Sequence, residues 1–128
     1  MSVNSFGYIH FGGDIRNIYI LLVLSSYLIA VDYETEIQPI FNANCIGCHG
    51  GSGGLTLTSY GSLMSGGNSD DVVIPDNGSE SLLIQKLRGT ASGSQMPKNQ
   101  DPLDESVIQL IENWIDEGAV GTISYMDY

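Results

Sequence analysis

The strongest hydrophobic pattern of the chain lies near its C-terminus. Between residues 107 and 115, apolar side chains recur at i, i+3, i+4, i+7 and i+8, which gives a helix one apolar face for a core. Asp104 stands where an N-cap is expected, Leu103 and Ile108 have the spacing of a hydrophobic staple, and Gly118 is placed to end the helix. The pattern predicts a C-terminal amphipathic helix whose apolar face is Val107, Leu110, Ile111, Trp114 and Ile115.

A second helical pattern precedes a pair of cysteines. Its recurring positions are Ile37, Ile40, Phe41, Asn44, Cys45 and Cys48. Thr35 and Gln38 have the spacing of a capping box, and Pro39 is tolerated in a first turn, where its missing N–H costs little. We therefore predict a helix that begins near Thr35 and ends at the cysteines.

The middle of the chain predicts two shorter helices separated by loops. One covers residues 59–64 and ends at Gly66 and Gly67; the other is capped by Ser79, runs to about Arg88 and ends at Gly89. Residues 55–58 read as extended loop, 68–78 as a loop with one apolar anchor, and 89–100 as a loop without periodicity. The whole pattern predicts a single small all-α domain.

The segment from Ile18 to Val31 differs from the rest because it carries no charge over 14 residues. A spanning helix needs about 18 or more such residues, whereas the apolar part of a signal peptide needs about 7–15. We interpret it as a secretory signal cleaved near Ala30, with an uncleaved membrane anchor as the alternative. His10 precedes this run, in the leading part of the N-terminal stretch, and is expected to have no role.

Charge narrows the possible partners. The 128 residues include 15 acidic and 4 basic side chains, for a net charge of -11. Nucleic-acid binding needs clustered Lys and Arg, so the acidic balance argues against a nucleic-acid partner. The same negative charge disfavours binding to anionic membrane surfaces. A charged partner should present a basic patch, because complementary fields speed encounter. Asp116 and Glu117 oppose the dipole of the last helix and are expected to serve the surface.

The chemistry of the chain concentrates in Cys45-Ile46-Gly47-Cys48-His49. The pattern C-x-x-C-H is typical of c-type haem attachment. Two thiols three positions apart can form thioether bonds to the vinyl groups of a porphyrin, and the histidine that follows is held as an iron ligand. A dithiol redox pair usually sits in a βαβ pattern, and a zinc site would need ligands beyond these, so both alternatives are disfavoured.

At these five residues the chain resembles the class I c-type cytochromes, which bind one haem through histidine and methionine. The resemblance implies a helical fold wrapped around a single covalently attached haem c. It also implies that Met96, followed by Pro97 in the loop before the last helix, is the second iron ligand beside His49. Many relatives have another proline where Lys98 stands.

The same resemblance implies further contacts. The first and last helices should cross with Phe41 against Trp114, and the other ring nitrogen of His49 should donate to a backbone carbonyl. Lys86 and Arg88 suit the C-terminal end of their helix and are also candidates for neutralising haem propionates.

These observations predict a signal or anchor segment over 1–31, a cytochrome c domain over 32–121 and a short tail over 122–128. The expected function is periplasmic or otherwise extracytoplasmic electron transfer between redox proteins, without enzymatic activity. Two alternatives remain open. One is a haem enzyme or sensor with an open sixth iron position, and the other is a structural protein that packs the haems of neighbouring copies.

Overall fold

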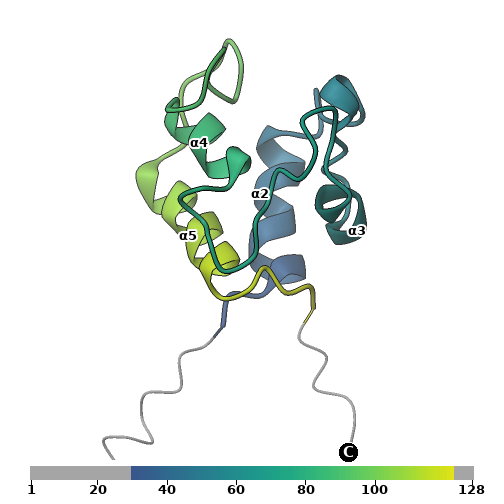
Figure 1. Ribbon diagram of the computed structural model, residues 1–128, viewed down its shortest axis with the longest axis vertical. Helices are drawn as coiled ribbons and strands as arrows, with labels where there is room; N and C mark the ends of the chain where they lie inside the picture. The colour runs from purple at the N-terminus through teal and green to yellow at the C-terminus, as the bar shows by residue number, and fades with distance from the viewer. Residues whose placement is uncertain (1–29, 123–128) are drawn as a thin grey trace, which may run out of the picture.

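The computed structural model describes residues 30–122, and this part of the chain is helical, with two isolated β-bridges and no strand. Its elements are η1 (Tyr33–Ile37, a π-helix), α2 (Gln38–Asn44), η2 (Ser52–Gly54, a 3₁₀ turn), α3 (Tyr60–Met64), α4 (Leu82–Arg88) and α5 (Glu105–Asp116) (Figure 1). The all-α prediction is confirmed for the described residues. Most of the apolar segment, His10 and nearly all of the tail lie outside them. Within 30–122, no helix has the length and apolar character needed to cross a membrane.

The first helical segment begins earlier than the predicted capping box. Asp32 is the N-cap, and its Oδ1 accepts a hydrogen bond from the Thr35 backbone N–H at 2.8 Å. Thr35 therefore donates to the cap and is not the cap itself, so the predicted box was wrong. Gln38 is buried instead: its side chain accepts from the Tyr33 hydroxyl at 2.8 Å and donates to the Leu57 carbonyl at 3.0 Å.

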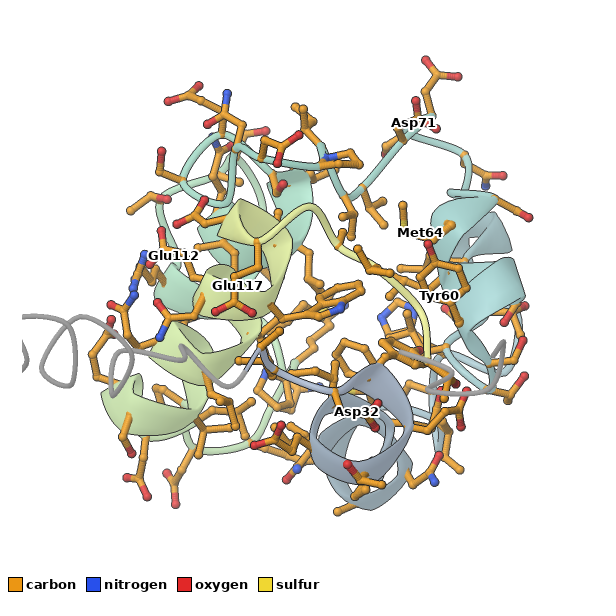
Figure 2. All side chains as sticks on the ribbon, turned by 90° about the horizontal axis from the view of Figure 1, so that it is seen from below. Asp32, Tyr60, Met64, Asp71, Glu112 and Glu117 are labelled. Carbon is orange, nitrogen blue, oxygen red and sulfur yellow. The ribbon has the colours of Figure 1, made fainter. Side chains whose placement is uncertain are left out.

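An aromatic cluster joins this segment to α5. Tyr33 is fully buried, with its ring centroid 5.2 Å from that of Trp114, 5.3 Å from that of Tyr60 and 6.4 Å from that of Phe41. Tyr60 reaches into the cluster from α3 (Figure 2). The ring of Tyr33 packs on both Phe41 and Trp114, and all three belong to one buried core cluster, while a direct pairing of Phe41 with Trp114 stays a prediction. The two helical segments still meet at Trp114.

The shorter helices follow the predicted order, with one changed start. Ser59 and Ser62 form the capping box of α3. Helix α4 begins at Leu82, with Ser81 and not Ser79 as N-cap. Ser81 is fully buried, and its hydroxyl accepts from the Ile74 N–H at 2.8 Å, so this residue anchors the preceding loop. Gly89 ends α4 in the left-handed conformation, as predicted, with a φ of 71°.

Helix α5 lies where the pattern placed it, with Asp104 at the N-cap position and Gly118 just beyond its end. The side chain of Asp104 makes no capping hydrogen bond. The carboxylates at the other end do more than face solvent. Asp116 Oδ1 accepts from the Gly78 N–H at 2.6 Å, and Glu117 Oε2 accepts from the Val31 N–H at 2.8 Å. They tie the end of α5 to two distant backbone segments, so the expected surface role was incomplete.

The elements give the molecule two distinct ends. Residues 31 and 122 lie at the same end, next to the start of η1 and the end of α5 (Figure 1). Helix α2 leads away from this end to the turn that contains the cysteines, and α4 leads to the loop after Gly89 (Figure 1). The candidate site lies between these two far segments.

Candidate functional site

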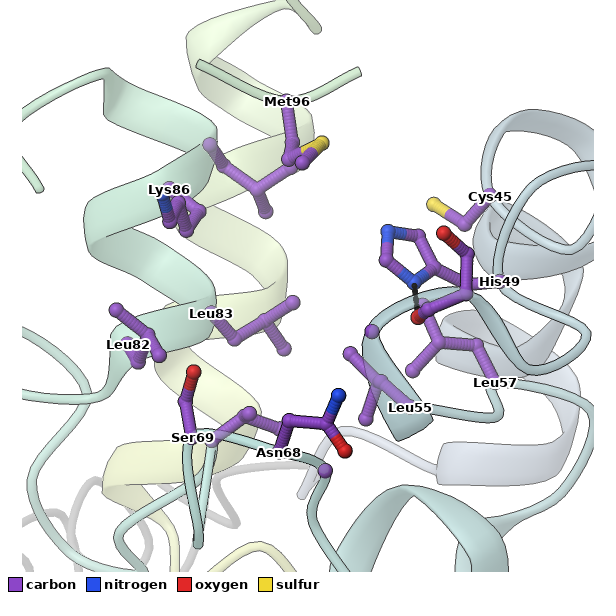
Figure 3. Close-up of a pocket in the computed structure, with 15 residues that line it drawn as sticks. Cys45, His49, Leu55, Leu57, Asn68, Ser69, Leu82, Leu83, Lys86 and Met96 are labelled. Carbon is purple, nitrogen blue, oxygen red and sulfur yellow. Dashed lines mark hydrogen bonds between the residues drawn. The ribbon is translucent and has the colours of Figure 1, made fainter. Parts of the chain in front are cut away.

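The site is an apolar cleft between two walls. It encloses about 710 Å³ of space, its open mouth included. We call residues 45–57 the histidine wall and residues 82–97 the methionine wall, after His49 and Met96 (Figure 3). The lining is mostly aliphatic, and its apolar side chains are Leu55, Leu57, Val72, Leu82, Leu83 and Leu87.

The histidine wall is shaped by hydrogen bonds between close neighbours. The Cys45 N–H donates to the Phe41 carbonyl at 2.8 Å, and the His49 N–H donates to the Cys45 carbonyl at 2.8 Å. His49 Nδ1 lies 3.1 Å from the Ser52 carbonyl, which can only accept, so Nδ1 carries the proton. The expected carbonyl partner of His49 is therefore Ser52. Nε2 keeps its lone pair and lies on the cleft side of the ring (Figure 3).

The two cysteines precede the histidine in the sequence and are not joined in a disulfide. Cys45 lines the cleft and is half-buried, whereas Cys48 is exposed and borders an adjoining part of the cleft that also includes His49 and Met96. Burial raises the pKa of the Cys45 thiol to about 11, and the neighbouring Cys48 adds to this effect. A catalytic dithiol needs a lowered thiol pKa, so the environment of Cys45 argues against that alternative.

No cluster suited to a zinc shell accompanies the cysteines. Within residues 30–122, no three His, Cys, Asp or Glu side chains are grouped closely enough to hold a metal ion together. Zinc in a structural site takes four such ligands. The described geometry therefore gives the zinc alternative no support.

The methionine wall brings Met96 to the cleft. Met96 is half-buried, lines both parts of the cleft, and its N–H donates to the Lys86 carbonyl at 2.9 Å. Met64, the other methionine of the described part, lies on α3 beside Tyr60 and packs against the core (Figure 2). The loop context of Met96 thus identified the methionine that faces the histidine wall.

The cationic side chains near the cleft have different environments. Arg88 pairs with Glu112 at 2.8 Å and with Glu105, so it links α4 to α5 and does not line the cleft. Arg88 lowers the pKa of the Glu112 carboxyl, and these carboxylates raise the pKa of Arg88. Lys86 does line the cleft, while its Nζ donates to the Ser92 carbonyl at 2.6 Å. Of the two candidates for a propionate contact, only Lys86 lines the cleft.

The residues present fit a haem. An imidazole nitrogen and a thioether lie on opposite walls, a thiol lies at the edge, and the surrounding side chains are aliphatic. This is the donor set of His/Met haem ligation. Sequence reasoning missed the Ser52 carbonyl and the side chain of Gln95, which donates to the Leu87 carbonyl at 2.7 Å. A sequence shows no signal for the first, and an exposed loop glutamine offers none for the second.

Comparison with known proteins agrees with this geometry. The family model described as Planctomycete cytochrome C matches residues 45–100, a stretch that contains Cys45, Cys48, His49 and Met96. Neither a search of curated proteins nor a search of solved structures gave a match. The matched stretch spans both walls of the cleft but less than half of the chain. It supports a cytochrome c-type protein, for which the family implies haem c, with its iron, as the cofactor.

Proposed function

We propose that this protein is an extracytoplasmic electron carrier that binds one haem c through thioether bonds to Cys45 and Cys48, with His49 and Met96 as iron ligands. The observation that carries the proposal is the placement of His49 and Met96 on opposite walls of one apolar cleft. The family match over residues 45–100 supports the same cofactor.

The residues of the chain have distinct roles in this proposal. The haem supplies one-electron chemistry, while the protein supplies binding, orientation and electrostatics. The Ser52 carbonyl fixes the ring of His49 with Nε2 available to the iron. The leucines of both walls exclude water, and a low dielectric strengthens electrostatic effects on the redox centre. Lys86 lines the cleft and is a candidate cation for a haem propionate.

A carrier is favoured over an enzyme by what lines the methionine wall. Peroxide chemistry requires an open iron position, usually with polar groups near it. The described lining of this cleft contains one histidine, no arginine and no carboxylate, and Met96 lies opposite the histidine. In the described lining, the methionine wall therefore offers a second ligand, with Lys86 as its only titratable side chain.

We also propose that the partners are redox proteins with a basic docking patch. The net charge of -11 supplies a long-range attraction to such a surface. Neither part of the cleft is lined by Asp or Glu, whereas Lys86 and Lys98 line it. The attraction then comes from the field of the whole domain and not from carboxylates at the cleft.

The proposed ligation is tested by the spectrum of protein matured in a host that attaches haem. We expect a low-spin iron with the weak near-infrared sulfur-to-iron band, and poor binding of carbon monoxide by the reduced form. Met96→Ala should abolish the band, open the iron position and lower the reduction potential, because a thioether favours reduced iron. Met64→Ala is the matched control and should change none of these. A high-spin wild type, or loss of the band in Met64→Ala, would contradict the assignment.

A further inference from the structure

Residues 89–100, which we call the methionine loop, fold back onto the end of α4. The last carbonyls of a helix normally lack partners within the helix. Here three consecutive ones accept from the loop: Gln85 from the Thr90 N–H at 2.9 Å, Lys86 from the Met96 N–H at 2.9 Å, and Leu87 from Gln95 Nε2 at 2.7 Å. The loop is therefore the cap of α4, and Met96 is placed by its contacts with that helix end.

The side chain of Gln95 packs against Gly89. A Cβ at Gly89 would lie 3.0 Å from Cδ and from Oε1 of Gln95, so the amide side chain lies directly against the glycine that ends α4. The left-handed conformation of Gly89 and the amide of Gln95 are thus complementary parts of one turn. A side chain at position 89 would force the amide of Gln95 to shift from its place beside the Leu87 carbonyl.

We infer that Gln95 is a positioning residue for Met96: its amide fixes the loop to α4 so that the thioether faces His49. This inference rests on the proposed function. Gln95 and Met96 are adjacent and donate to the adjacent carbonyls of Leu87 and Lys86, so the loop is held to α4 at Met96 and at the residue before it. Gln95 is absent from the cleft lining and acts through Met96 alone.

In other metal sites, loss of an outer-shell hydrogen bond lowers metal affinity about 10–100-fold. We use this range for the effect expected from losing the Gln95 contact. The test uses holoprotein carrying Gln95→Glu, an isosteric change that removes the donor to Leu87. The control is Gln85→Glu, which adds the same charge and removes a similar contact, since Gln85 Nε2 donates to the Ser79 carbonyl at the other end of α4. Gln95→Lys keeps a donor of similar reach.

We expect Gln95→Glu to weaken the near-infrared band and to raise the affinity of the reduced form for carbon monoxide about 10-fold, the lower end of that range. Gln85→Glu should change neither, and Gln95→Lys should keep the band. Thermal unfolding of the holoproteins shows whether the two Glu variants differ in general stability.

Two results would overturn this inference without affecting the proposed Met96 ligation. One is a near-infrared band that is as strong in Gln95→Glu as in the wild type. The other is equal weakening of that band in Gln95→Glu and Gln85→Glu. A wild type without the band overturns the proposed Met96 ligation, and this inference with it.

Discussion

The two walls of the cleft are built in different ways. On the histidine wall, the contacts that set His49 join residues three and four positions apart, through the carbonyls of Ser52 and Cys45. On the methionine wall, Met96 is held through Lys86, ten positions earlier. The helix that carries this contact is itself tied to α5 by the ion pair of Arg88 with Glu112.

This difference separates what a short motif encodes from what the whole fold encodes. The conformation around His49 follows from one turn of chain, so five residues are enough to recognise it. The position of Met96 depends on the end of α4, on a side chain of its own loop and on the packing of α4 against α5. We therefore expect the methionine wall to loosen under milder changes than the histidine wall.

The largest effect should come from removing the proposed covalent link between the haem and the histidine wall. Cys45→Ala with Cys48→Ala should leave no haem on the denatured protein, whereas Cys48→Ala alone leaves a single possible bond. His49→Ala should keep the haem attached but misligated. Intact mass after denaturation measures each case. Two free thiols in denatured wild type that has matured with haem would contradict covalent attachment.

A pair of glycine substitutions compares the two walls directly. Gly89→Ala forces a side chain into the left-handed conformation and against Gln95, and we expect a loss of about 1 kcal/mol or more in unfolding free energy. Gly47→Ala meets no atom within 4 Å and should cost less than about 0.5 kcal/mol. Urea unfolding measures both. Equal losses would show that the walls are equally tolerant.

A smaller and pH-dependent effect should follow from the ion pair behind the methionine wall. Because Arg88 lowers the pKa of Glu112, the pair stabilises the fold fully above the ordinary carboxyl pKa, and this contribution is lost as the pH falls through the lowered value. At pH 7, Glu112→Gln should cost about 1.5–3 kcal/mol, the usual range for a hydrogen bond to a charged group. The difference from wild type should shrink in acid. Glu80→Gln, at an exposed position, is the control in urea unfolding; a gap that persists at low pH would contradict this account.

The parts of the fold that follow a regular sequence pattern or a single marker residue were predictable. The apolar stripe fixed α5 almost to the residue, and glycine ended α4 at position 89 because few other residues adopt that conformation. The motif at the cysteines, with Met96 in its loop, identified residues that the structure brings to one cleft.

The errors arose where distant residues compete for the same partner. Thr35 has a cap-forming side chain, but Asp32 is a charged acceptor three residues earlier and takes the N–H of Thr35. Ser79 and Ser81 are equivalent in sequence, and only the burial of Ser81 under the preceding loop distinguishes them. Tyr33 stands four positions before Ile37 and continues the helical spacing, but it precedes the predicted start at Thr35, so its place at the centre of the aromatic cluster was missed.

Both ends of the described chain lie at the same end of the molecule, from which α2 leads away toward the cysteines (Figure 1). An attachment made at either end, whether to a bilayer, to another domain or to an electrode surface, would act beside the start of η1 and the end of α5, which contribute no residue to the described lining of the cleft. The Glu117 contact with the Val31 N–H adds a stiff start to such a tether, since it joins the first residues of the fold to the last helix. Tethering can therefore use a part of this small domain that contributes nothing to the lining of the cleft.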